Sequence, residues 1–158
     1  MVLTGDCLLV LHVVPYSSFN LATPLSITEL ETNWMRFPPL DRGQANHRYV
    51  NFDGFVVLFG SSNPVAKQLS YTQVFRSGIV EAVSAIGQGD GAVHASKIDK
   101  YCVIGAKRYV DALSTVDVDC PIVVLASLVG MQGRTIVSGI DNLAAPYGSQ
   151  EIRENELH

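Results

Sequence analysis

Two neighbouring stretches of the chain have the two-residue periodicity of strands, with alternate residues on opposite sides. Residues 69–76 and residues 79–86 both follow this pattern, and Ser77-Gly78 lies between them. Alternation with a period of two is typical of a half-buried strand. A two-residue connection that contains glycine is typical of a tight turn between antiparallel strands. The sequence therefore predicts an antiparallel hairpin here.

Two other stretches are apolar without alternation. Residues 7–14 (CLLVLHVV) and the start of residues 121–129 (PIVVLASLV) have the length and β-branched content of strands, whereas the end of the second run, LASLVGM, is also compatible with a helix. Such a run is typical of a strand that is buried on both faces, or of one packed at an interface. His12 interrupts the first run, and we interpret it as a hydrogen-bonded core or interface histidine. Residues 134–137 are predicted to form a last, short edge strand.

Residues 49–59 (YVNFDGFVVLF) allow two interpretations. Asp53-Gly54 could form the turn of a hairpin. Alternatively, Gly54 could mark a bulge within one long strand. We favour the bulge, because the run VVLF needs a partner longer than the four residues that precede Asp53.

The longest helix is predicted to start at Ser96, which has capping-box spacing with Asp99. Gly105 lies in the middle of this helix, where glycine is unfavourable, so a close approach to the sheet is expected. A shorter helix is predicted over residues 27–34, because Ser26 and Glu29 have the same spacing. Residues at intervals of three or four define the buried stripe of the long helix: Ile98, Cys102, Gly105, Tyr109, Leu113 and Val116.

These elements predict an α+β fold. An antiparallel sheet of about five strands would carry one long helix on one face, giving a two-layer sandwich. The proline-rich residues 16–47, with Trp34, Met35 and Phe37, would form a covering flap. Residues 1–150 are expected to be a single domain, and residues 151–158 a frayed acidic tail.

The chain of 158 residues is weakly charged. Charged residues make up 16%, and the formal net charge is −4. An ordinary globular domain has about 25% charged residues, so an uncharged, buried interface and a homo-oligomer are expected. The negative balance argues against direct binding of nucleic acid.

Targeting signals and cysteine patterns indicate a cytoplasmic protein that is not bound to a membrane. The apolar run at 7–14 is far shorter than the ~20 residues of a membrane span. No Lys or Arg precedes Arg36, so the positive start of a secretory signal is missing. Cys7, Cys102 and Cys120 are widely spaced and are predicted to be reduced thiols.

No motif for catalysis, metal binding or cofactor binding is present. The chain contains neither H-E-x-x-H nor G-x-S-x-G. We therefore predict no catalytic residue, no metal ligand and no cofactor. An alternative hypothesis is a hydrolase or nuclease with dispersed residues, for which Asp117, Asp119 and His94 are the candidates. A solvated loop is the simpler interpretation of the two aspartates.

Glu81 is the most unusual charged residue, since it lies inside a predicted strand. A cross-strand ion pair with Arg76 is the first interpretation. The alternative is a small-ligand sensor, with a pocket between sheet, helix and flap. Arg76, Glu81, Trp34 and Tyr49 are the candidate ligand-binding residues of that pocket.

The predicted interface rests on the two apolar runs. Leu9 and Leu11 represent the first run, and Val123 and Leu125 the second. All four are candidates for contacts with another copy of the chain or with a partner domain.

An ordered set of segments resembles a known protein region. The segments are RYVNFDGFVVLFG at 48–60, SYTQVFRSGIVEAVSA at 70–85, PIVVLASLVGMQG at 121–133 and the opening LLVLHVVPYSSF. Together they resemble the C-terminal region of bacterial proteins whose N-terminal half is a Schlafen-type, Alba-like domain assigned to DNA binding and often labelled ATP-binding. The resemblance covers roughly residues 7–137.

The resemblance implies an accessory domain, either a fragment or a stand-alone version, and no catalytic or binding residue is carried over from it. The nucleic-acid-binding half of such proteins would lie upstream, so an upstream Schlafen-like domain is the implied partner. The predicted function is a non-enzymatic module for self-association or partner binding.

Overall fold

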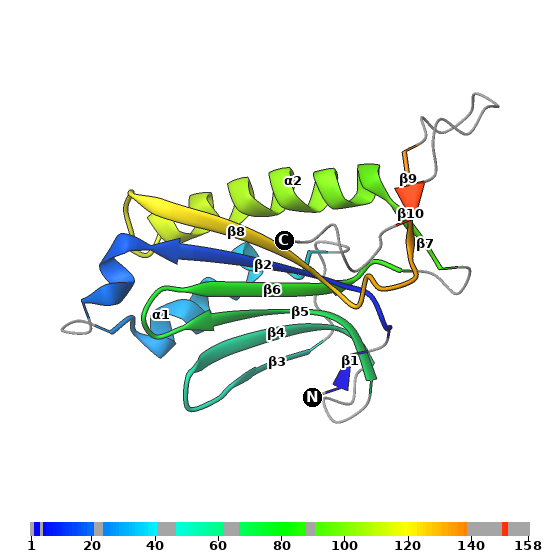
Figure 1. Ribbon diagram of the computed structural model, residues 1–158. Coiled ribbons are helices and arrows are strands. Elements are labelled where there is room, and N and C mark those ends of the chain that lie inside the picture. Colours follow the sequence, from blue (N-terminus) through cyan, green and yellow to red (C-terminus); the bar gives the residue numbers. More distant parts are fainter. Residues whose placement is uncertain are drawn as a thin grey trace.

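The computed structural model describes residues 2–3, 5–20, 24–40, 47–61, 67–87, 91–138 and 150–151. At residues 2, 150 and 151 only the backbone is described. The chain has an α+β architecture with a curved sheet and one long helix (Figure 1). This confirms the predicted fold class.

The main sheet is antiparallel along its whole strand order. Strand β2 pairs with both β6 and β8, so β8 forms one edge and β3 the other. A short strand, β1 (Val2–Leu3), adds in parallel to β5. The order across the sheet is β3 (His47–Val50), β4 (Gly54–Gly60), β5 (Lys67–Phe75), β6 (Val80–Ala85), β2 (Leu8–Pro15) and β8 (Ile122–Val129).

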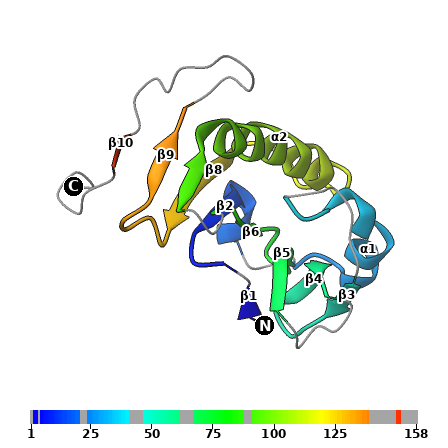
Figure 2. The same ribbon diagram turned by 90° about the vertical axis from the view of Figure 1, so that its right-hand side faces the viewer.

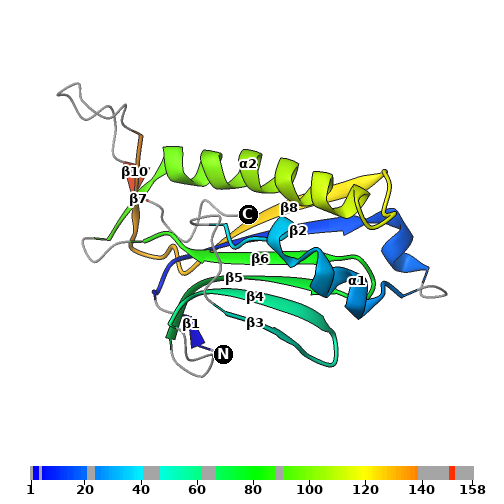
Figure 3. The same cartoon turned by 180° about the vertical axis from the view of Figure 1, so that it is seen from behind.

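The helices α1 and α2 lie on one side of this sheet (Figure 2), and the view from behind shows both crossing in front of the strands (Figure 3). Helix α1 (Ile27–Thr32) has the predicted cap, with the Glu29 amide donating to Ser26 Oγ at 3.5 Å. Helix α2 spans Ala95–Ser114, so it starts before Ser96, and the prediction of Ser96 as its cap is wrong. Two 3₁₀ turns, η1 (Tyr16–Phe19) and η2 (Trp34–Arg36), flank α1.

A second, small sheet lies at one end of α2. Strand β7 (Ala92–His94) pairs in parallel with β9 (Thr135–Val137), and β10 (Gln150–Glu151) pairs with β9. The strand predicted over residues 134–137 therefore exists, but it belongs to this sheet. The predicted frayed tail lies outside the described residues, apart from the backbone of Glu151.

Both hairpins differ in detail from the sequence-based expectation. Asn51 to Asp53 connect β3 to β4, with the Gly54 amide donating to Asn51 Oδ1 at 2.8 Å, so the favoured bulge is wrong.

The hairpin of β5 and β6 is confirmed, but its loop has three residues and not two. The Phe75 amide donates to the Ile79 carbonyl at 2.8 Å, which leaves Arg76, Ser77 and Gly78 in the loop. Gly78 has a φ of 87°, as the last residue of such a loop requires.

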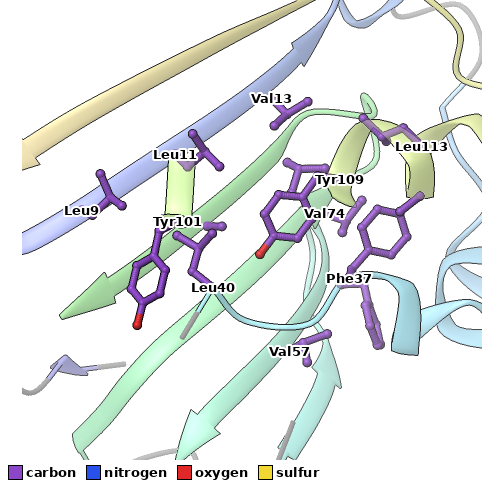
Figure 4. Close-up of a cluster of buried hydrophobic side chains, with 14 of the residues drawn as sticks. Leu9, Leu11, Val13, Phe37, Leu40, Val57, Val74, Tyr101, Tyr109 and Leu113 are labelled. Carbon is purple, nitrogen blue, oxygen red and sulfur yellow. The ribbon is translucent and has the colours of Figure 1, made fainter. Parts of the chain in front are cut away.

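The core lies between the sheet and the helices (Figure 4). A Cβ atom at Gly105 would come within 2.6 Å of Leu40 Cδ2 and 3.1 Å of Leu11 Cδ2, which confirms the predicted close approach of α2. Within the segment predicted to be a flap, Leu30, Phe37 and Leu40 are buried. These residues therefore belong to the core layer on the helix side.

Candidate interaction surface

The face of the sheet turned away from the helices, here called the open face, carries a mixed row of side chains. The strand registers place the following residues side by side across all six strands: Tyr49, Val56, Gln73, Glu81, His12 and Leu125. No helix in the described part of the chain covers this face (Figure 2). The row ends at β8, on the edge of the sheet.

A hydrogen-bond network links three strands on the open face. The Tyr71 hydroxyl donates to Glu81 Oε1 at 2.5 Å, and His12 Nε2 lies 3.0 Å from Glu81 Oε2. The side chains of His12 and Glu81 are 33% and 26% exposed, so the network is half-buried. It joins β5, β6 and β2. Each oxygen of the Glu81 carboxylate already has a partner within the network. The role of the network is therefore to hold these strands together.

Two of the three residues of this network, His12 and Glu81, were singled out from the sequence. His12 was expected to be hydrogen-bonded, and it is. Glu81 was singled out, but its expected ion pair with Arg76 is wrong. Arg76 lies in the hairpin loop, where its Nε donates to the Phe52 carbonyl at 3.1 Å. Tyr71 was not recognised from the sequence. The only signal was the alternation of residues 69–76, which places Tyr71 on the same strand face as Gln73.

The environment of Tyr71 favours the protonated form of its hydroxyl. Burial, the hydrogen bond to Glu81 and the negative charge of Glu81 all raise the pKa of Tyr71 above its usual range. The folded protein therefore keeps the Tyr71 proton at alkaline pH, where the unfolded chain releases it.

We predict that this linkage makes stability fall as the pH rises past about 10, the ordinary pKa of tyrosine. Because the folded pKa is raised, the contribution is present below that pH and is lost above it. Urea denaturation of the wild type and of Tyr71→Phe between pH 8 and 11 would measure it. The variant should lose stability less steeply with pH. Equal slopes for the two proteins would contradict the prediction.

The edge strand β8 is the most exposed apolar element of the sheet. Its eight residues contain no Asp, Glu, Lys, Arg or Pro. Val123 and Leu125 are 55% and 53% exposed on the open face, and Val124 and Leu128 are also exposed, on the helix side. An edge strand offers a row of backbone N–H and C=O groups to another strand. A long apolar edge is therefore a surface on which a further strand can add.

The opposite edge of the sheet is protected in the usual way. Strand β3 has only four residues, and two of them are His47 and Arg48. The Arg48 guanidinium lies 4.5 Å from the centre of the Trp34 ring. Short length and charged side chains are the common means of blocking edge-to-edge pairing. Strand β8 has neither of these protections.

The four residues predicted to lie at an interface separate into two pairs. Leu9 and Leu11 are fully buried beneath the helix layer and belong to the core (Figure 4). Val123 and Leu125 are exposed on β8. Only the second pair is available to a partner of the folded chain.

The four residues predicted to bind a ligand are not brought together. Glu81 and Tyr49 share the open face, but Trp34 lies on the helix side and Arg76 in the β5–β6 loop. Two cavities formed by described residues, one beside α2 and one beside η1, are lined by other residues.

The candidates for a hydrolase or nuclease are also separated. His94 precedes α2 and Asp117 follows it, and a helix of 20 residues is about 30 Å long. Asp117 has a φ of 57°, so it and Asp119 do not form the extended pair considered above.

Among the described residues, no group of three or more His, Cys, Asp or Glu side chains could hold a metal ion. In the same part of the chain, no helix is both long and apolar enough to cross a membrane.

Comparison with protein-family models, with curated protein sequences and with solved structures gave no match. The functional interpretation therefore depends on the geometry described above.

Proposed function

We propose that this protein is a non-enzymatic self-association module that dimerises through β8. The observation that carries the proposal is the eight-residue, uncharged edge strand with exposed apolar side chains on both of its faces. Isolated exposed apolar residues are common, but a continuous apolar edge is a typical association site.

A second copy of the chain is the partner that this edge fits best. Two β8 strands related by a two-fold axis would pair antiparallel, so that the same apolar side chains meet from both copies. Val123 and Leu125 would be covered on the open face, and Val124 and Leu128 on the helix side. Neither strand contributes a charge that would have to be buried.

The two-fold axis of such a pair stands perpendicular to the sheet. The two sheets would then form one continuous sheet, with both α2 helices on the same side. The row of residues on the open face would continue from Leu125 of one copy into the other. Closed pairing of this kind covers the β8 edge of each copy and does not propagate into a fibre.

The resemblance to the C-terminal region of Schlafen-type proteins supports the same kind of role. In that setting, the module would bring together two copies of a nucleic-acid-binding domain. Its low share of charged residues, 16%, is consistent with binding to protein and not to nucleic acid.

We expect the wild type to have twice the chain mass of 17.1 kDa in light scattering coupled to size exclusion. Leu125→Lys should be monomeric, because it places two cations close to each other at the seam, with a dissociation constant raised about 100-fold or more. Val103→Lys is the matched control, since Val103 is a similarly exposed apolar residue, 69% exposed, that belongs to α2 and not to β8. Circular dichroism would show that both variants are folded.

Two results would contradict the proposal. One is a wild type that remains monomeric at about 100 μM, a concentration well above the dissociation constant of a stable dimer. The other is a Leu125→Lys variant that remains dimeric together with Val103→Lys. Binding of a different protein to an otherwise monomeric chain would show that the edge serves another partner.

A further inference from the structure

A cavity of about 720 Å³ is lined by residues that follow β2 and α2. The ends of these two elements, and the start of β8, are on the left of Figure 1. The described lining of the cavity comes from η1, from the residues before and within the first turn of α1, from the β5–β6 loop and from the segment after α2. A volume of this size is typical of small-molecule sites. None of the four ligand-binding residues expected from the sequence lines it.

Backbone hydrogen bonds between distant segments hold the frame of this cavity. The Tyr16 amide donates to the Pro121 carbonyl at 2.9 Å, which fixes η1 to the start of β8. The Leu25 amide donates to the Arg76 carbonyl at 2.7 Å, which fixes the start of the α1 segment to the hairpin loop. The cavity is therefore formed by the fold itself before any ligand binds.

Two aromatic rings are exposed at the cavity. Tyr16 and Phe19 are 71% and 76% exposed, and their ring centres are 6.3 Å apart at an angle of 61°. Large aromatic side chains are normally buried, so a pair of exposed rings at a cavity indicates a binding surface. The faces of aromatic rings attract cations, and quaternary ammonium groups are a well-known example.

The charged residues that line the cavity also favour a cation. Glu29 and Asp117 both line it, and none of its described lining residues is basic. Neither carboxylate forms an ion pair within the described part of the chain. Two carboxylates without a cation beside exposed rings favour a positively charged ligand.

From these observations we infer that this cavity binds a small organic cation, an ammonium group that carries an apolar or aromatic part. The ammonium group would lie between Glu29 and Asp117, and the apolar part would contact Tyr16 and Phe19. The inference does not depend on dimerisation through β8, and a monomeric Leu125→Lys variant should bind equally well.

Titration of the ¹⁵N-labelled protein with benzyltrimethylammonium, followed by NMR, tests this inference. We expect shifts in the amide signals of Ser77, Val116 and Val118 that saturate with a millimolar dissociation constant, on the order of 1 mM. Benzenesulfonate, an anion with a similar ring, should not produce them. Added salt should weaken binding, because part of the attraction is between exposed charges.

Variants that keep the local structure make the test specific. Asp117→Asn retains a residue that tolerates a positive φ, and Glu29→Gln retains a residue suited to the capping box. Each should weaken binding about fivefold or more, and both together should abolish it. Phe19→Leu should weaken it about two- to fivefold. Glu31→Gln and Asp119→Asn are the matched controls, since neither residue lines the cavity.

Three results would overturn the inference. The first is the absence of shifts up to roughly 10 mM of the cation. The second is equal binding of benzenesulfonate. The third is a double variant Glu29→Gln/Asp117→Asn that binds as well as the two controls.

Discussion

Replacing Gly54 by alanine is expected to destabilise the fold by about 3 kcal/mol or more, because the added atom meets backbone. A Cβ atom at Gly54 would lie 2.0 Å from the Val74 carbonyl oxygen and 3.0 Å from Phe75 Cα. These atoms belong to the paired strand β5 and cannot move without disturbing the sheet. Thermal unfolding should show a midpoint lowered by about 6–12 °C.

Gly133→Ala is the control for this variant. Gly133 has a φ of 69°, and nothing lies within 4 Å of its added Cβ atom. Its replacement should cost only about 1–2 kcal/mol, from the left-handed backbone conformation. Equal unfolding midpoints for Gly54→Ala and Gly133→Ala would show that the close approach of β4 and β5 is absent.

Truncation of Tyr109 to alanine is expected to cost about 3–5 kcal/mol, as for other large buried rings. Tyr109 is fully buried, and its hydroxyl donates to the Pro38 carbonyl at 2.7 Å and lies 2.9 Å from Thr72 Oγ1. The side chain thus connects α2 with β5 and with the chain after η2 (Figure 4). Urea denaturation monitored by circular dichroism would measure the loss.

Tyr109→Phe separates the ring from the hydroxyl. It keeps the packing and removes the two hydrogen bonds, so it should cost about 1–2 kcal/mol. The Thr72 hydroxyl, 3.1 Å from the Pro38 carbonyl, can then donate to that carbonyl, which limits this loss. A Tyr109→Ala variant as stable as Tyr109→Phe would mean that the ring does not fill the core.

The candidate site was only partly visible in the sequence. Glu81 was recognisable because a carboxylate inside a strand is unusual, and Val123 and Leu125 because of their apolar run. The partner of Glu81 was misjudged because the hairpin loop has three residues, which removes Arg76 from the strand. The contact of Glu81 with His12 depends on the pairing of β6 with β2, and nothing local in the sequence indicates that pairing.

The cavity beside η1 was not visible in the sequence either. Asp117 and Glu29 are both visible in the sequence as ordinary loop and helix residues, and Tyr16 and Phe19 as part of an irregular segment. The described lining of the cavity combines residues between 16 and 29 with Ser77 and with residues 116–118, which are distant from them along the chain. Only the packing of the chain brings these residues around one cavity.

The periodicity of the sequence is sufficient to predict the longest elements of this protein. Alternation with a period of two fixed β5 and β6, and three- and four-residue spacing fixed α2, because these periods are the geometry of strands and helices. The place of each strand in the sheet, by contrast, depends on contacts between segments that are far apart in the sequence. The two apolar runs have similar composition, yet β2 lies inside the sheet and β8 lies at its edge. Strand order depends on pairing between distant segments, and that pairing leaves the apolar side chains of β8 exposed.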